Sequence, residues 1–186
     1  MMPNSNRLQF GFVTIECLQG DISRQPDMDA IINAANALLM PGGGVAGAIH
    51  SKAGPELARE CRPLAPIRPG EAVITSGCNL PNKHVIHCLG PVYGIDKPEE
   101  NLLANCYRNA LGLAEANGLH SIAFPAISTG AFGYPLESAA RVTFAAIRDF
   151  NAWHSLQHVR FVLWSDKDWE LFSRVMEEIF AWCPLR

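Results

Sequence analysis

The sequence has no long hydrophobic run and no export signal at its start. No apolar stretch approaches the ~20 residues that a membrane-spanning helix needs. The first residues, MMPNSNRLQFGF, lack the basic-then-apolar pattern of a secretory signal peptide. From these absences we expect a cytoplasmic protein with no membrane partner.

An excess of basic residues is also missing. Lys and Arg together number 15 against 18 Asp and Glu, which gives a formal net charge of −3. Broad binding to nucleic acid requires a basic excess or a basic stripe, so the charge balance argues against a nucleic-acid partner. If the protein binds an anion, local backbone dipoles must hold it rather than the overall electrostatic field.

The cysteines form no CxxC pair, and most of them lie in apolar runs. We therefore expect reduced, mostly buried thiols and no metal site, and a cysteine nucleophile has no supporting local pattern. The motifs GxGxxG and GxxxxGK[ST] are absent too, which disfavours a dinucleotide-binding dehydrogenase and a P-loop NTPase. The six cysteines are Cys17, Cys61, Cys78, Cys88, Cys106 and Cys183.

What is present is an ordinary globular composition with alternating strand and helix patterns. The chain has 186 residues, of which 48% are hydrophobic, enough for one domain over residues 1–186. The alternation predicts an α/β fold with three layers, α/β/α, and a mixed, mostly parallel central sheet. We expect strands at 8–18, 29–32, 71–76, 84–88, 121–127 and 159–163, and helices at 45–61, 98–117, 135–150 and 168–180.

The most informative stretch is NAANALLMPGGGVAGAIH, residues 33–50. It passes from a buried strand through three consecutive glycines into a helix start, an arrangement that presents backbone N–H groups to an anion. A flexible loop is the alternative interpretation. A second glycine-bearing turn spans 128–133, and a polar turn spans 20–23. All three follow strands, where ligands of α/β sheets bind, so the pattern suits a ligand with two phosphates, or with a phosphate and a sugar.

Four segments, in this order, resemble the macro domain, the ADP-ribose-binding module: GDI, NAAN, GGGVAGAIH and AFPAISTGAFGYP. The resemblance covers roughly residues 13–166. The stretches AGPELARECRPL and GEAVITSGCNLPNKHVIHCLGP look like the MacroD-type branch. Its members remove ADP-ribose from acidic side chains and deacetylate O-acetyl-ADP-ribose. The resemblance thus implies ADP-ribose or an ADP-ribosylated protein as partner, with neither a cofactor nor a metal.

The resemblance also implies roles for particular residues. Asp21 would accept a hydrogen bond from the adenine amino group, with the Ile22 backbone beside it. Asn36 would bind the distal ribose hydroxyls and place the attacking water, which makes it the candidate catalytic residue. Phe132 would pack on the distal ribose, although an ordinary core aromatic is an equal alternative. The remaining substrate-binding candidates are Ala35, Gly42, Gly43, Gly44, Val45, Ala46, Gly47, Ser128, Thr129, Gly130 and Ala131.

Other polar residues are interpreted as structural. We expect Asn33 to bond loop backbone and His50 to be packed and hydrogen-bonded. His84 and His87 alternate along a strand in a way that does not suit a metal pair. Trp164 follows the last strand one residue before the position where many relatives carry an adenine-stacking aromatic, so stacking by Trp164 is disfavoured.

One departure from the MacroD-type pattern concerns catalysis. Ala46 stands where the branch usually has an aspartate that activates or orients water, and a methyl group cannot accept a proton. Other macro domains carry GGGVAGA and are hydrolases, for which a water activated by the substrate's diphosphate is a sensible mechanism. We therefore predict an ADP-ribosyl-ester hydrolase, with a non-catalytic ADP-ribose reader as the alternative. Single-stranded nucleic-acid binding is a weaker third hypothesis.

Overall fold

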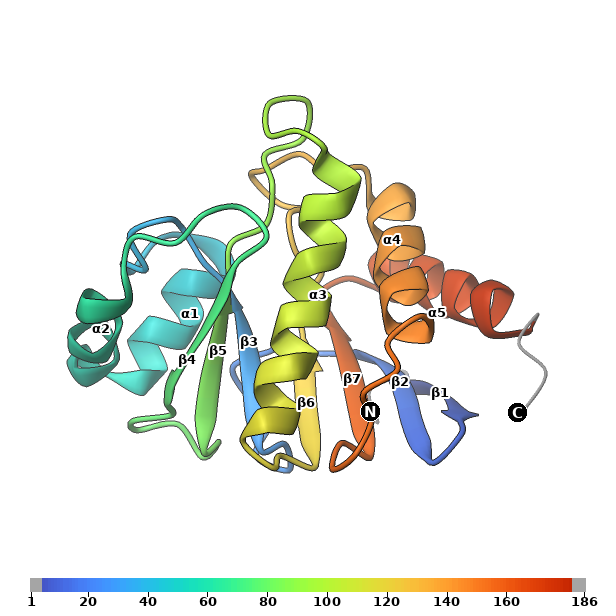
Figure 1. Ribbon diagram of the computed structural model, residues 1–186, viewed down its shortest axis with the longest axis horizontal. Coiled ribbons are helices and arrows are strands. Elements are labelled where there is room, and N and C mark those ends of the chain that lie inside the picture. Colours follow the sequence, from blue (N-terminus) through green and yellow to red (C-terminus); the bar gives the residue numbers. More distant parts are fainter. Residues whose placement is uncertain (1–4, 182–186) are drawn as a thin grey trace.

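The computed structural model describes residues 5–181, in which one mixed sheet is covered by helices on both faces (Figure 1). The strands are β1 Ser5–Phe10, β2 Val13–Gln19, β3 Ala30–Ala34, β4 Ala72–Ser76, β5 His84–Cys88, β6 Ser121–Phe124 and β7 His158–Leu163. The helices are α1 Gly44–Ala53, α2 Pro55–Cys61, the 3-10 turn η1 Arg62–Leu64, α3 Glu99–Ala116, α4 Leu136–Arg148 and α5 Asp166–Ala181.

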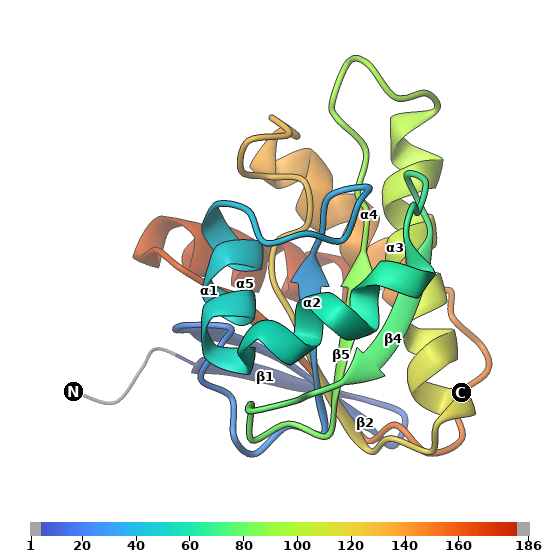
Figure 2. The same ribbon diagram turned by 90° about the vertical axis from the view of Figure 1, so that its left-hand side faces the viewer.

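The sheet has the order β1-β2-β7-β6-β3-β5-β4. Its five central strands run parallel, and the edge strands β1 and β4 pair antiparallel with β2 and β5. Helices α3, α4 and α5 cover one face of the sheet, and α1 and α2 cover the other (Figure 2). A hydrophobic core lies between each set of helices and the sheet. Neighbouring residues of β3 alternate between these cores, as the pleat of a strand requires. The predicted mixed three-layer α/β/α fold is confirmed.

The expected single strand at 8–18 is wrong, because the segment is a β-hairpin. Phe10 pairs with Val13, and a tight turn at Gly11, with φ of +59°, reverses the chain. Glycine adopts a positive φ at no steric cost, so this residue permits the reversal. The strand expected at 121–127 is also shorter, since β6 ends at Phe124 and is followed by Pro125, which has no N–H to donate to a ladder.

The expected single helix at 45–61 is two helices. Gly54, with φ of +82°, separates α1 from α2, and Pro55 begins the second helix. The four-residue spacing misled the sequence interpretation because buried residues of both helices enter the same core. Within residues 5–181, no helix is both long enough and apolar enough to cross a membrane.

Parallel strands carry their carboxyl ends to one edge of the sheet, the upper edge in Figure 1. The chain leaves that edge from β2, β3, β5 and β6 in four connections: 20–29, 35–43, 89–98 and 125–135. The described cysteines are free thiols. Cys17, Cys61, Cys88 and Cys106 are buried and Cys78 is partly buried, whereas Cys183 lies outside the described residues.

Candidate functional site

The three predicted loops meet at this edge of the sheet. Lys52 of α1 forms an ion pair with Asp21, at 3.1 Å between Nζ and Oδ2, so the turn after β2 lies against α1. Ile22, Val45 and Phe132, one from each loop, belong to or pack on the same core. The three loops therefore border one core on the α1 side of the sheet.

The glycine-rich loop ends at the uncapped N-terminus of α1. Gly43 occupies the cap position, makes no side-chain cap hydrogen bond, and no acidic residue lies in the first turn. The first N–H groups of a helix have no partner within the helix, and the macrodipole gives this end a partial positive charge. The N–H groups at 44–46 are therefore not satisfied by the helix itself or by a side-chain cap, so an anion at this end of α1 remains a prediction of the glycine motif.

Three further glycines lie in this loop or at the start of α1. Gly44 has φ of +57°, in the left-handed region that side chains disfavour. A Cβ on Gly47 would overlap the carbonyl oxygen of Gly42, so only glycine lets the loop lie this close to α1. A Cβ on Gly42 would lie 3.5 Å from Asn36 Nδ2. Asn36 is therefore a direct neighbour of the glycine-rich loop.

Asn36 closes its own loop, which the sequence did not reveal. Its Nδ2 donates to the carbonyl of Met40 at 2.8 Å, and its Oδ1 accepts from the Met40 N–H at 3.1 Å. One N–H of the amide and further lone pairs on its oxygen remain for a ligand. The side chain is partly exposed and held in one orientation, so it can bind a hydroxyl without losing rotamer freedom. Ala35 next to it is buried, and its N–H donates to the Cys88 carbonyl.

The polar residues beneath the loop differ from expectation in two details. Asn33 does not bond loop backbone; its buried Nδ2 lies 3.1 Å from His87 Nδ1. His50 is packed, with 5% of its surface exposed, but neither ring nitrogen has a hydrogen-bond partner among the described residues. Burial, together with the neighbouring His50, lowers the pKa of His87 to about 3, and burial also lowers the pKa of His50. Both rings are therefore neutral near pH 7.

His84 and His87 contact the neighbouring strand β4. His87 Nε2 lies 3.0 Å from Thr75 Oγ1 and 3.6 Å from Cys61 Sγ, while His84 Nδ1 lies 3.1 Å from the Thr75 carbonyl oxygen. Within the described part of the chain, no three His, Cys, Asp or Glu side chains gather where they could hold a metal.

The second glycine-bearing turn contains a strained serine. Ser128 has φ of +66°, is buried, and its Oγ has no hydrogen-bond partner within residues 5–181. A non-glycine residue in the left-handed region costs about 1–3 kcal/mol, and such residues cluster at functional sites. Gly90 lies directly against Ser128, because a Cβ there would overlap the hydroxyl. The rest of the turn is held locally, with Thr129 Oγ1 donating to the Ala126 carbonyl at 2.8 Å.

Phe132 at the end of this turn is partly buried on the α1 side of the sheet. Its carbonyl accepts a hydrogen bond from the Tyr93 N–H at 2.9 Å, which ties the turn to the connection after β5. Gly130 and Ala131 before it are exposed. Phe132 is therefore half core residue and half surface, a combination that fits both interpretations offered by the sequence.

The turn after β2 holds Asp21 through its neighbours. Asp21 Oδ1 accepts from the Ser23 backbone N–H at 2.9 Å and from the Ser23 hydroxyl, while Oδ2 faces Lys52. Burial alone would raise the pKa of Asp21, but these hydrogen bonds and the charge of Lys52 outweigh it and hold the pKa below its usual value. Sequence reasoning missed Lys52, which carries no motif signal and looks like an ordinary residue of an exposed helix face.

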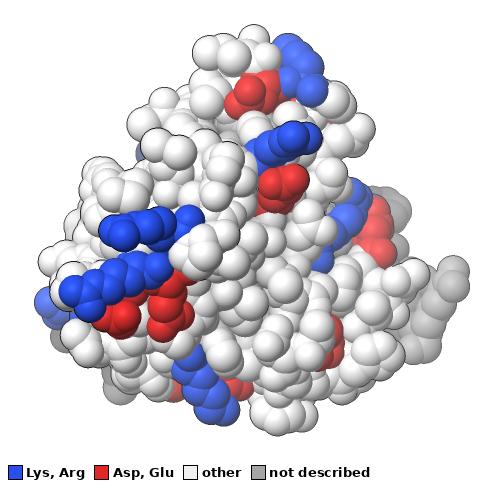
Figure 3. Space-filling view, turned by 60° about the vertical axis from the view of Figure 1, so that its left-hand side comes forward, with Lys and Arg blue, Asp and Glu red and all other residues white. Residues whose placement is uncertain are grey.

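Trp164 and Ser165 follow the end of β7. Trp164 is 79% exposed, and Ser165 Oγ accepts a hydrogen bond from the Asp168 N–H at the start of α5. Ser165 therefore has a capping role. On the face shown in Figure 3, basic and acidic side chains lie interspersed rather than in one basic stripe.

Comparisons with known proteins agree with this geometry. Residues 32–143 match the family model described as the macro domain. An O-acetyl-ADP-ribose deacetylase of Cronobacter sakazakii is 45% identical over 168 residues, which cover 87% of this chain and 93% of that protein. A macrodomain of Oceanobacillus iheyensis, solved with ADP, is 38% identical and superposes with a TM-score of 0.92 over 97% of this chain and 99% of its own.

A Trypanosoma brucei macrodomain, solved in complex with ADP-ribose, is also 38% identical; its TM-score is 0.79, over 86% of this chain and 68% of its own. The family match spans more than half of the chain and includes the glycine-rich loop, Asn36 and the Ser128–Phe132 turn. The chain belongs to the macro domain family.

Proposed function

We propose that this protein binds ADP-ribose and hydrolyses ADP-ribosyl esters, either on acidic side chains of proteins or in O-acetyl-ADP-ribose. The observation that carries the proposal is the uncapped N-terminus of α1 directly beside the fixed amide of Asn36. The names of the Cronobacter relative and of the two ligand-bound macrodomains support it.

The binding roles follow from the chemistry of the loops. The N–H groups of Gly44, Val45 and Ala46 face the diphosphate, where each contact with the helix dipole contributes about 0.3–1 kcal/mol. The Ser128–Phe132 turn closes over the other side of the diphosphate, and Phe132 packs on the distal ribose. Asp21 and the Ile22 N–H bind the adenine edge.

The reaction is hydrolysis of the ester between the distal ribose and an acyl group. Asn36 holds the ribose hydroxyls and orients a water molecule, whose oxygen attacks the ester carbonyl carbon. The bond from that carbon to the ribose oxygen breaks, giving a ribose hydroxyl and a carboxylate. A phosphate oxygen of the substrate accepts one proton of the attacking water, since the first turn of α1 contains no carboxylate. This proton passes to the departing ribose oxygen, and the second proton of the water leaves the new carboxylic acid for solvent.

A second candidate function is a reader that binds ADP-ribose without turnover. Ala46 favours it, because this residue is buried in the first turn of α1 and offers only a methyl group there. In a reader, the ester persists for hours while calorimetry shows tight ADP-ribose binding. Replacing Ala46 with Asp should then create or raise activity; an unchanged rate would mean that Ala46 is not what limits catalysis.

The test is a time course on O-acetyl-ADP-ribose and on glutamate-linked ADP-ribose, with ADP-ribose binding measured in parallel. We expect Asn36→Ala to lower the rate about 100-fold, within the range of a lost positioning contact. Asn117→Ala is the matched control, because Asn117 Nδ2 also donates to a backbone carbonyl four residues away but lies at the far end of α3. Equal rates in wild type and Asn36→Ala would refute the role of Asn36.

A further inference from the structure

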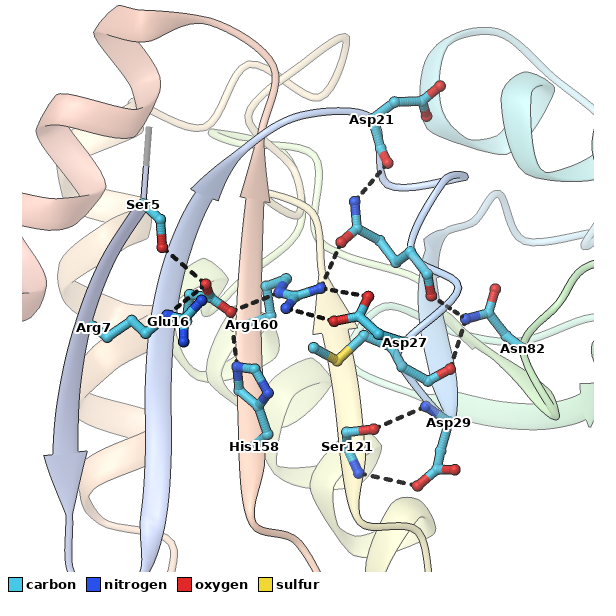
Figure 4. A network of polar contacts seen from close by, with 12 residues as sticks. Ser5, Arg7, Glu16, Asp21, Asp27, Asp29, Asn82, Ser121, His158 and Arg160 are labelled. Atoms are coloured by element: carbon cyan, nitrogen blue, oxygen red, sulfur yellow. Dashed lines mark hydrogen bonds and ion pairs between the residues drawn. The ribbon is translucent and has the colours of Figure 1, made fainter. Parts of the chain in front are cut away.

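A chain of buried polar side chains connects the middle of the sheet to the turn that carries Asp21 (Figure 4). It begins at Glu16 of β2, whose surface is 0% exposed. Arg160 is its direct neighbour on the parallel strand β7 and donates from Nε to Glu16 Oε2 at 2.7 Å. Ser5, Arg7 and His158 complete the surroundings of this carboxylate. Arg160 is thus anchored at one end by a buried charge.

The other end of Arg160 fixes Gln25 and Asp27, which lie in the connection between β2 and β3. Nη1 donates to Gln25 Oε1 and to Asp27 Oδ1, both at 2.9 Å, and Nη2 donates to Asp27 Oδ2 at 2.8 Å. Because Gln25 Oε1 faces the guanidinium, its Nε2 must face the other way. Nε2 donates to the backbone carbonyl of Asp21 at 2.8 Å. Asn82 Nδ2 holds the Gln25 backbone carbonyl at 2.7 Å.

The carbonyl of Asp21 therefore has a fixed direction. It accepts both the Gln25 amide and the Arg24 N–H, the latter at 3.0 Å. A trans peptide is planar, so the Ile22 N–H points away from the carbonyl and away from Gln25. No group within residues 5–181 accepts a hydrogen bond from this N–H. The Asp21 carboxylate also points away from the network, toward α1 (Figure 4).

The result is an acceptor, the Asp21 carboxylate held by Ser23 and Lys52, next in the chain to a free donor, the Ile22 N–H. The peptide that carries this N–H is held by Gln25, which Arg160 holds in turn. An adenine edge matches this pair, because its amino group donates and its ring nitrogen N1 accepts. A 6-oxopurine presents the opposite pattern. Its O6 oxygen, an acceptor, would face the Asp21 carboxylate, and its N1–H, a donor, would face the Ile22 N–H. A site built around paired polar groups discriminates strongly against a ligand that leaves them unpaired.

We infer that Arg160 and Gln25 are positioning residues that set a preference for a 6-aminopurine over a 6-oxopurine. The inference rests on the proposed function, since it assumes that the base of ADP-ribose lies against Asp21 and Ile22. Neither residue touches the ligand: both are more than nine-tenths buried and act through the Asp21–Ile22 peptide.

The experiment compares dissociation constants for ADP-ribose and its hypoxanthine analogue by calorimetry. Gln25→Glu keeps an oxygen for Arg160 but replaces the donor to the Asp21 carbonyl with a second acceptor. Gln25→Met removes both contacts, and Arg160→Lys removes the fork. Gln157→Glu is the matched control, an identical change at an exposed residue before β7. The ratio of the two constants is independent of the folded fraction, so a destabilised variant still reports on preference.

We expect wild type and Gln157→Glu to prefer ADP-ribose at least tenfold. Gln25→Glu should weaken ADP-ribose binding about tenfold, as expected for a lost hydrogen bond with an opposing acceptor, and should change binding of the hypoxanthine analogue less than threefold. Gln25→Met and Arg160→Lys should move the ratio in the same direction by a smaller factor. An unchanged ratio in all three variants, or no preference in wild type, would overturn the inference. Wild type that binds neither compound would instead refute the proposed function.

Discussion

The two sides of the candidate site are held in place by different means. The connection between β2 and β3, which carries Asp21, is fixed by side chains, and Ser23, Gln25 and Met28 within it are buried. The glycine-rich loop between β3 and α1 is mostly exposed; Leu38 is 62% and Met40 50% exposed. Its shape comes from glycines and from the single amide of Asn36. The shape of the first connection thus depends on a buried charged network, and the shape of the second depends on glycines, which have no side chain.

This difference separates the sensitivities of the two sides. Removing a charge from the first side takes an ion-pair partner away from a buried carboxylate, which costs folding stability. Adding an atom to the second side displaces backbone at the anion site, which costs binding. The following variants test whether charge removal on the first side costs mainly stability and whether an added atom on the second side costs mainly binding.

The largest effect is expected for Arg160→Met. The variant leaves Glu16 fully buried with Arg7 as its remaining ion-pair partner and with Ser5 and His158 in hydrogen-bond contact, and it frees Asp27 and Gln25. Breaking a buried ion pair by removing one partner costs about 3 kcal/mol or more of unfolding free energy. Urea unfolding measures this loss. The control Arg174→Met removes an arginine that pairs on the surface with Glu137 and Glu178, and should change the unfolding free energy far less, because solvent screens such pairs. Equal losses of unfolding free energy in Arg160→Met and Arg174→Met would contradict the claim that buried charge holds the Asp21 side.

Gly47→Ala tests the glycine side. Its Cβ would overlap the Gly42 carbonyl, so the loop must move away from α1. We expect ADP-ribose affinity to fall at least tenfold, with a stability loss of about 1–3 kcal/mol from overpacking. Gly112→Ala is the control, because nothing lies within 4 Å of a Cβ there in the middle of α3. It should leave affinity unchanged and raise stability by about 0.5–1 kcal/mol. Calorimetry and thermal unfolding distinguish the two outcomes.

The sequence predicted these two sides unequally. The glycine-rich loop is local, so Gly42 to Gly47, the strand before them and the helix after them could be recognised from spacing alone. The side-chain network is not local: Arg160 lies more than a hundred residues from Gln25, and within VRFVL it looks like any polar residue of a strand. Its partners become visible only when β7 pairs with β2.

The fold shows the same contrast between local and distant information. Alternation of strands and helices predicted the layers and the mixed sheet. The break at Gly54 was missed because the four-residue spacing of apolar residues continues across that glycine. The hairpin at Gly11 was missed because β-forming residues stand on both sides of that glycine, although the inward residues change from Leu8 and Phe10 to Val13 and Ile15 there. The local contacts of Asn36 and Ser128 depend on side-chain and backbone geometry that residue spacing in the sequence does not predict. Asn36 closes its loop onto Met40, and Ser128 takes up a strained backbone against Gly90.

Acid should destabilise the two sides in different pH ranges. Burial depresses the pKa of His87, beneath the glycine-rich loop, to about 3, so the unfolded chain binds a proton that the folded chain does not. Stability is then lost as the pH falls below about 6.5, by about 1.4 kcal/mol per pH unit for one such group.

The carboxylate side responds at lower pH. Burial opposes ionisation of Glu16, but hydrogen bonds from His158, Arg160 and Ser5 outweigh it and hold its pKa well below the usual value. Its contribution is present above about pH 4.3 and is lost as the pH falls further. Urea unfolding from pH 7.5 to 3 measures how the unfolding free energy changes with pH. Compared with wild type, this dependence should be weaker above pH 5 in His87→Gln and weaker below pH 5 in Glu16→Gln. Slopes unchanged in both ranges would contradict this assignment.

The smallest effect is expected for Lys52→Met, which crosses the boundary between the two sides. Lys52 belongs to α1 yet pairs with Asp21, and its side chain is 35% exposed. Solvent screens such a pair, so the unfolding free energy should fall by less than about 1 kcal/mol. The pKa of Asp21 should rise, because Lys52 is one of the groups that lower it, and NMR titration of the Asp21 carboxyl measures this change. If the two sides are held independently, ADP-ribose affinity should change less than threefold, since Gln25 still fixes the Asp21 carbonyl. A larger loss would show that α1 itself supports the adenine side, and that the two sides act as one unit.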